Sequence, residues 1–280
     1  MCVAGVLLSS ASYGQSSRGN EFMIGFFPFN YDRPVAIFVT TNEPTPVRFT
    51  VEEYISIGWS PQIFSVLIST QNRTTEYGRT TVIRFLPISR IVAYELMTSA
   101  IRYVRVTAEG GKNITVFGLN DADDPGAFLA LPCQSYDGIT SSNPYEYFIF
   151  SANNPSFCSS FLIVTCEDDT TINILPSQTI RVFENITSAG GTLTLSGQQS
   201  RQTIYIEANQ CGQDLTGTII TSEKPISVFA GHVCGRVSAD RTTCGHLVEQ
   251  IPPHVVWGTT FFTVPLGRRM AGDCFIVGVV

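Results

Sequence analysis

Residues 217–232, GTIITSEKPISVFAGH, decide the fold of this chain. Two runs of β-branched and aromatic residues, which favour strands, enclose a short turn of charged residues and proline. The same arrangement occurs three more times, as VAIFVTTNEPTPVRFTV at 35–51, YVRVTAEGGKNITVFGLN at 103–120 and FLIVTCEDDTTINILP at 161–176. A pattern that returns at a nearly regular interval indicates a repeated structural unit, so we expect an array of antiparallel strand pairs.

Further strand-like runs lie between these pairs, including TLTL at 192–195 and TIYIE at 203–207. Each repeat should therefore hold about four strands. The predicted modules span roughly 19–87, 88–144, 145–210 and 211–265, and the next begins at 266–280. Helical periodicity is confined to SRIVAYELMTSAIRYV at 89–104, which we interpret as strand because the matching place in the next copy is strand-like.

The predicted fold class is all-β, built from repeated four-stranded antiparallel modules in a β-propeller-like array that is incomplete in this chain. The alternative pairs two modules into one sandwich of about 110 residues, giving tandem β-sandwiches. The last residues, FIVGVV, resemble a buried strand, so the native protein is expected to continue past Val280.

Composition excludes several classes of function. Of the 280 residues, 14% are charged and 44% are hydrophobic, and the formal net charge is -6. The chain lacks the basic surface that binds a phosphate backbone, so nucleic acid is not an expected partner. No apolar run is long enough for a membrane-spanning helix, so no membrane insertion is expected within these residues. No cofactor motif is present either.

Several features predict a secreted glycoprotein. Residues 1–14, MCVAGVLLSSASYG, resemble a truncated signal peptide. Sequons mark Asn72, Asn113 and Asn185 as glycosylation sites. Without Cys2, seven cysteines remain, and an odd number in an oxidising compartment leaves one thiol, such as Cys274, for a disulfide-linked assembly.

Two cysteines and two histidines form the pattern that most resembles a ligand set. His232 and Cys234 are mirrored by Cys244 and His246, which could hold zinc tetrahedrally. A disulfide between Cys234 and Cys244 is favoured for a secreted chain, and the histidines would then anchor the loop by hydrogen bonds. We therefore predict a disulfide and no metal.

Loops between the strands are the predicted binding regions. The candidates are Asp121, Asp123, Asp124, His232, Arg236, His246 and Trp257. The run NDADDPGAF at 120–128 supplies acidic residues for a weak calcium site but lacks the remaining ligands of a calcium-binding loop, and a solvated turn is the simpler interpretation. Trp257 follows a loop and could offer a stacking face for a sugar.

Catalytic motifs are absent from the sequence. It has no GxSxG, HExxH, phosphate-binding loop or GxGxxG pattern. We predict that the chain is not an enzyme. A carbohydrate-active enzyme that uses Glu249 with a second carboxylate is the weakest alternative.

Three long strings identify a family resemblance. FGLNDADDPGAFLALP at 117–132, ITSEKPISVFAGH at 220–232 and CGHLVEQIPP at 244–253 resemble the N-terminal domain of the IgGFc-binding protein family, over a region from about residue 19 to 280. The resemblance implies a secreted mucus- or matrix-associated protein whose partners are extracellular glycoproteins, mucins or glycans. It transfers no catalytic residues and no Fc contact.

The predicted function is a non-enzymatic extracellular binding or scaffold module that recognises protein or glycan ligands through loops on a rigid β scaffold. A structural spacer joined by disulfides is the alternative.

Overall fold

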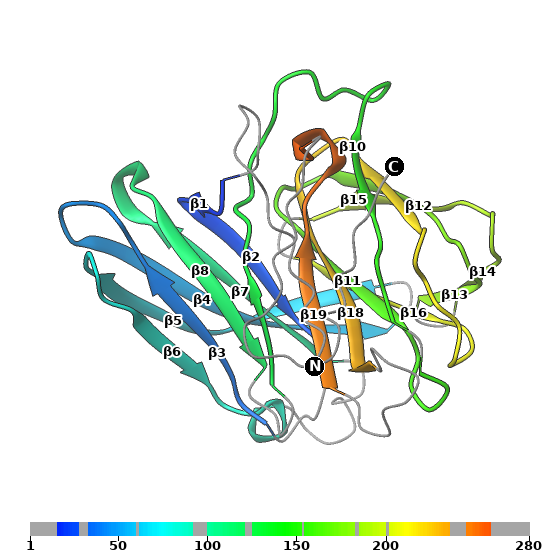
Figure 1. The fold of residues 1–280 in the computed structure, drawn as a ribbon, viewed down its shortest axis with the longest axis horizontal. Coiled ribbons are helices and arrows are strands. Elements are labelled where there is room, and N and C mark those ends of the chain that lie inside the picture. Colours follow the sequence, from blue (N-terminus) through cyan, green and yellow to red (C-terminus); the bar gives the residue numbers. More distant parts are fainter. Residues whose placement is uncertain are drawn as a thin grey trace, which may run out of the picture.

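A computed structural model describes residues 16–27, 33–59, 62–91, 100–120, 125–152, 154–182, 185–199, 202–235 and 245–258. These ranges contain nineteen β-strands and three short 3₁₀ helices (Figure 1). The strands of the first half are β1 Arg18–Gly19, β2 Glu21–Phe26, β3 Val35–Thr40, β4 Val47–Trp59, β5 Gln62–Thr75, β6 Thr81–Phe85, β7 Ala100–Ala108, β8 Ile114–Asn120 and β9 Gly126–Leu129. Those of the second half are β10 Tyr145–Phe148, β11 Ser160–Thr165, β12 Thr170–Leu175, β13 Ile180–Val182, β14 Asn185–Thr187, β15 Leu193–Gln198, β16 Thr203–Ala208, β17 Ile219–Ser222, β18 Ile226–Gly235 and β19 Gly245–Ile251. The 3₁₀ helices are η1 Ile88–Arg90, η3 Glu109–Gly111 and η4 His254–Val256.

The strands form four antiparallel sheets. We name them sheet A (β1, β3, β6, β8, β9), sheet B (β2, β4, β5, β7), sheet C (β11, β13, β14, β16, β18, β19) and sheet D (β10, β12, β15, β17). Sheets A and B make the first unit, and sheets C and D make the second. The prediction of an all-β chain of repeated antiparallel modules is confirmed, and the four small sheets have a propeller-like arrangement.

The two units have the same topology. Sheet B has the strand order β2-β7-β4-β5, and sheet D has the matching order β10-β17-β12-β15. In the same way β9-β8-β3-β6 of sheet A matches β19-β18-β11-β16 of sheet C. Consecutive strands mostly alternate between the two sheets of a unit, which is the connectivity of the tandem two-sheet units that the alternative prediction described.

Each unit has its own hydrophobic core, because the inward-facing residues of its two sheets alternate with outward-facing ones. In β12, Thr170, Ile172 and Ile174 are buried and their neighbours are more exposed. Strand β11 does not alternate, since all six of its residues are buried. Its two faces lie in different cores: Phe161 and Ile163 in that of the second unit, Leu162 and Val164 in that of the first.

The two units are therefore packed against each other through sheets B and C. Gly25 of β2 lies so close to Leu162 that a Cβ at this position would be 2.4 Å from the Leu162 Cδ2 atom. Glycine allows this approach because it has no side chain. The ring of Phe27 also meets the ring of Tyr205, with centroids 6.2 Å apart.

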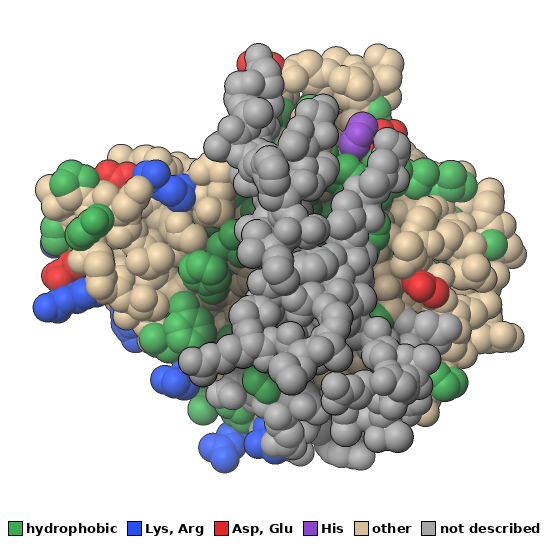
Figure 2. Space-filling model, viewed as in Figure 1, with side chains coloured by type: hydrophobic (Ala, Val, Ile, Leu, Met, Phe, Trp, Pro, Cys, Tyr) green, Lys and Arg blue, Asp and Glu red, His purple; other side chains and the backbone are tan. Residues whose placement is uncertain are grey.

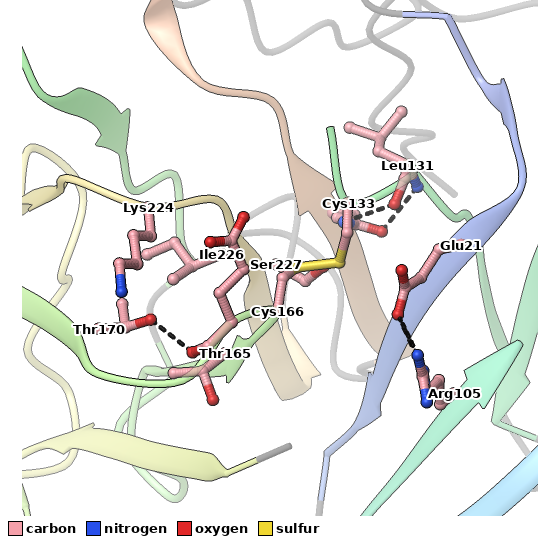
Figure 3. The surroundings of a disulfide bond; sticks show 12 residues. Glu21, Arg105, Leu131, Cys133, Thr165, Cys166, Thr170, Lys224, Ile226 and Ser227 are labelled. Carbon is pink, nitrogen blue, oxygen red and sulfur yellow. Dashed lines mark hydrogen bonds and ion pairs between the residues drawn. A yellow bond between two sulfur atoms is a disulfide. The ribbon is translucent and has the colours of Figure 1, made fainter. Parts of the chain in front are cut away.

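The segment that follows β9 is joined covalently to the second unit. Cys133 forms a disulfide with Cys166 at the end of β11, and its backbone N–H donates to the Glu21 carbonyl at 2.9 Å. Figure 3 shows this disulfide together with the Glu21–Arg105 ion pair of sheet B, in which Arg105 Nη2 lies 2.8 Å from Glu21 Oε1. The disulfide thus ties the segment between the two units to the end of β11.

Of the ambiguous stretch 89–104, the described residues from Ala100 onward are strand, as part of β7, and Ile88–Arg90 form a 3₁₀ turn. The residues from 92 to 99 lie outside the described part.

Candidate functional site

The β18–β19 hairpin carries both histidines of the predicted ligand pattern, and both are buried. The backbone N–H of Cys234 donates to His232 Nδ1 at 3.0 Å. Nε2 of His232 lies 3.3 Å from the Phe157 carbonyl and donates to it in the tautomer that these two contacts require. Both nitrogens of His232 are therefore occupied within the protein.

His246 reaches across the junction between the units. Its Nε2 is hydrogen-bonded to Nδ2 of Asn120, the last residue of β8. Burial lowers the pKa of His246 to about 4, and burial also lowers the pKa of His232. Both imidazoles are thus neutral near pH 7, where a neutral ring packs without the cost of a buried charge.

The two histidines of the pattern thus make hydrogen bonds within the protein, and the absence of a metal stays a prediction because Cys244 lies outside the described residues. Within the described ranges, no group of three or more His, Cys, Asp or Glu side chains is placed to hold a metal ion. Cys234 is disulfide-bonded. Since Cys244 lies outside the described residues, its pairing with Cys234 stays a prediction.

Sequence reasoning left the other disulfides open. The structure joins Cys133 to Cys166 and Cys158 to Cys211. Spacing could not reveal these pairs, because their members are 33 and 53 positions apart and many pairings fit the same sequence.

Several predicted residues fall outside the described part. They are Asp121, Asp123, Asp124, Arg236, Cys274 and the signal-like residues 1–14. The three sequon asparagines are described, and Asn72 and Asn185 are exposed, while Asn113 is half-buried. Their glycosylation stays a prediction.

Trp257 belongs to a group of side chains on the outer side of sheet D. We call the group of Glu146, Phe148, Phe150, His254 and Trp257 the Trp257 surface. Strand β10 supplies Glu146 and Phe148, because the alternating Tyr145 and Tyr147 point into the core. Helix η4 packs beside β10 and brings His254 and Trp257 to the same place.

The rings of the Trp257 surface contact one another. Trp257 stacks on Phe150 at 6.4 Å between centroids, and it lies 5.6 Å from Phe148 and 5.4 Å from His254. The indole Nε1–H donates to the Pro252 carbonyl at 3.1 Å, which holds the indole in place. The indole is therefore positioned by one backbone hydrogen bond and three ring contacts.

A carboxylate and an imidazole border the rings. Oε2 of Glu146 lies 3.9 Å from Nδ1 of His254, and these side chains are 45% and 46% exposed. Rings that present an apolar face beside groups that accept and donate hydrogen bonds can hold a ligand with both kinds of surface, such as a sugar. The sequence indicated only Trp257; Phe148 could have been found from the alternation in YEYF, whereas η4 is placed by tertiary packing.

A small pocket lies at the junction of the units, lined in part by Tyr136, Tyr147 and Gln250. None of the residues that line it is a carboxylate. Burial raises the pKa of Glu249 to about 7, but Glu249 is not part of this lining. The pocket therefore does not contain the pair of carboxylates that glycoside hydrolysis requires.

These features define the class of protein: a disulfide-linked module of two equivalent β units with a preformed aromatic surface. Among the described residues, no helix could cross a membrane. The family model described as IgGFc binding protein matches residues 126–279, more than half of the chain, and the chain belongs to this family.

The human IgGFc-binding protein is a relative that is 35% identical to this chain over 68 residues. That match covers 24% of this chain and 1% of the human protein. No solved structure matches the chain. The family match includes the whole second unit and only β9 of the first, so the resemblance of residues 19–125 stays a prediction.

Proposed function

We propose that this chain is a non-enzymatic recognition module of a secreted glycoprotein, and that it binds glycans of mucins or other extracellular glycoproteins through the Trp257 surface. The observation that carries the proposal is the preformed set of rings beside the exposed Glu146 and His254. An aromatic face covers the apolar side of a sugar, while a carboxylate and an imidazole can bond its hydroxyl groups.

The extracellular setting is supported by the disulfides Cys133–Cys166 and Cys158–Cys211. Disulfides persist in oxidising compartments and are rare in the cytosol. The family supports a binding role, because the human relative is named for binding IgG Fc. Fc binding is not transferred to this chain, since the match to the relative covers only 68 residues.

The test uses the whole chain, secreted from a eukaryotic host so that disulfides and glycans form. Binding is measured on a glycan array and against immobilised mucin, with IgG Fc as a protein ligand. Trp257→Ala is expected to weaken glycan binding about tenfold, which corresponds to about 1.4 kcal/mol. Glu146→Gln, a change on a half-exposed side chain, is expected to weaken it without affecting the fold.

Tyr77→Ala is the matched control, because Tyr77 is 71% exposed and belongs to the first unit. It should bind like the wild type. Unchanged binding by both Trp257→Ala and Glu146→Gln would reject this surface as the site. Binding to Fc alone would reject glycans as the ligand class.

A spacer role is the second candidate, and the disulfide and buried hydrogen bonds at the junction between the units favour it. A covalent assembly through an unpaired cysteine such as Cys274 predicts multimers on non-reducing gels that collapse to monomers after reduction.

A further inference from the structure

Strand β5 ends sheet B with a long edge that no described strand covers. Its 14 residues, Gln62–Thr75, pair with β4 on one side, and no other described strand pairs with them. An edge strand presents backbone N–H and C=O groups that a further strand can bond. Val66, Leu67 and Ile68 of β5 are 49%, 48% and 36% exposed, so apolar side chains flank this edge.

The second unit lacks the segment that carries these residues. Its equivalent strands, β12 and β15, have 6 residues each, whereas β4 has 13 and β5 has 14. The cross-strand pairs Thr50–Asn72 and Asn173–Thr194 hold matching positions, and in both the threonine Oγ1 donates to the asparagine Oδ1. In this alignment Gln62–Thr70 has no counterpart in β15, so the common fold of the units does not require it.

The extension is attached to the fold from the side of β4. Ile55 of β4 packs with Ala100 of β7 and Ile88 of η1 in a small cluster of its own. None of the described side chains of β5 belongs to this cluster or to the cores of the two units. The exposed apolar residues of β5 therefore have no part in the packing of the described chain.

The composition of this segment fits a copy of itself. Residues 62–72, QIFSVLISTQN, contain no charged residue and no proline. Figure 2 shows Lys and Arg side chains on other parts of the first unit, at the left of the view. Natural edge strands are commonly protected by charges or proline, and uncharged segments rich in β-branched residues pair with identical segments. Since the segment offers no charge for a different partner to match, a second copy is the occupant that its chemistry specifies.

A bulge limits the length of edge that can pair. The register of β5 on β4 shifts at Ile68, which is an extra residue on β5. A bulge interrupts the ladder of hydrogen bonds and bends the strand. The continuous edge is therefore Gln62–Leu67, and the sequon at Asn72 lies beyond the bulge.

We propose that two copies of this chain associate through Gln62–Leu67 of β5, so that the two B sheets join into one. A two-fold axis across the strands makes the pairing antiparallel, as it is for every pair of named strands within the described chain. The same segment serves in both copies, so the interface is isologous and closes at the dimer. Val66 and Leu67 point to opposite faces of the sheet, and both faces thus gain contacts between side chains of the two strands.

The test is sedimentation velocity of the full chain over a wide concentration range. Wild-type protein should pass from the 30.6 kDa monomer to a dimer and to nothing larger. Val66→Lys and Leu67→Lys each add the kind of charge that protects natural edges. Because each substitution occurs twice in the dimer, it should raise the dissociation constant about tenfold. Ser196→Lys is the matched control, since Ser196 is exposed on β15, the edge strand of sheet D.

Hydrogen exchange identifies the strand that forms the interface. Backbone amides within Gln62–Leu67 should exchange more slowly in concentrated than in dilute wild-type protein, whereas those of β15 should not change. Wild-type protein that is monomeric at every concentration would overturn the proposal. So would a dimer that both lysine variants leave intact, or one in which exchange slows only in other segments. Circular dichroism of each variant confirms that it is folded.

Discussion

The side chain of Gln250 pairs with the backbone of Leu131 as a neighbouring strand would. Its Oε1 accepts the Leu131 N–H at 2.8 Å, and its Nε2 donates to the Leu131 carbonyl at 3.2 Å. Both residues are buried, Leu131 directly after β9 of the first unit and Gln250 in β19 of the second. One amide thus satisfies two backbone groups that water cannot reach at the junction.

Replacing this amide should destabilise the protein. Gln250→Leu leaves a buried N–H and a buried carbonyl without partners, which costs about 2–4 kcal/mol. Urea denaturation measures the loss in the free energy of unfolding. Gln210→Leu, at an exposed position, should change it by less than about 0.5 kcal/mol. Equal stability of the two variants would contradict the importance of this contact.

Protonation of His246 should weaken the same junction in acid. Its pKa is about 4 in the folded protein and about 6.5 when it is free, because burial disfavours the charged ring. The unfolded chain therefore binds more protons between these values, and the stability that is fully present above pH 6.5 is lost as the pH falls towards 4. This contribution is roughly 3 kcal/mol.

The measurement is the free energy of unfolding at several pH values for wild type and His246→Gln. The variant keeps an amide near Asn120 but does not titrate, so its curve should lack the acid loss. His254→Gln changes a side chain that is 46% exposed and is the control. A His246→Gln curve parallel to that of the wild type would disprove the role of this histidine.

Ionisation of Glu249 should change the free energy of unfolding with pH in the opposite direction to that of His246. Burial raises its pKa from 4.5 to about 7, so the folded protein binds more protons than the unfolded chain between these values. Stability from this group is present below pH 4.5 and is lost as the pH rises through 7. Glu249→Gln should therefore stabilise the protein at pH 8, by about 1–3 kcal/mol, and leave it unchanged at pH 4. Thermal unfolding at both pH values tests this, with the exposed Glu223→Gln as the control.

A buried ion pair in sheet B should be sensitive to the loss of one partner. Arg102 Nε lies 3.0 Å from Glu53 Oε1 without the alignment of a linear hydrogen bond, and the side chains are 1% and 6% exposed. Ser69 Oγ donates to the other Glu53 oxygen at 3.0 Å. Arg102→Met leaves the carboxylate unpaired and should cost about 3–5 kcal/mol.

The double variant Arg102→Met with Glu53→Leu should recover most of that loss, because no buried charge remains. Arg181→Met removes an ion pair with Glu207 in which the arginine is 46% exposed, and should cost at most about 1 kcal/mol. Denaturation of all variants completes the cycle. A double variant less stable than Arg102→Met would argue against this account.

Local sequence pattern was sufficient for the strands and their repetition. Runs such as GTIITS and PISVFAG are rich in β-branched residues, and turn residues separate one run from the next. These strands can be recognised without knowing which distant residues they contact. The turn expected within FLIVTCEDDTTINILP at 161–176 separates β11 from β12, and Asp169 in it has a φ of 56°. Of the binding residues, Trp257 could be proposed because its loop position is visible in the sequence.

The sequence by itself determined that this chain is all-β, repeated and a member of a recognisable family, since these depend on residue types and short spacings. Only the tertiary structure decided that consecutive strands divide between two sheets, that Cys133 pairs with Cys166, and that His246 meets Asn120. It also brought Phe148 to Trp257, residues that lie on different elements. The physical reason is that these contacts join residues far apart along the chain, where the packing of whole sheets selects the partner.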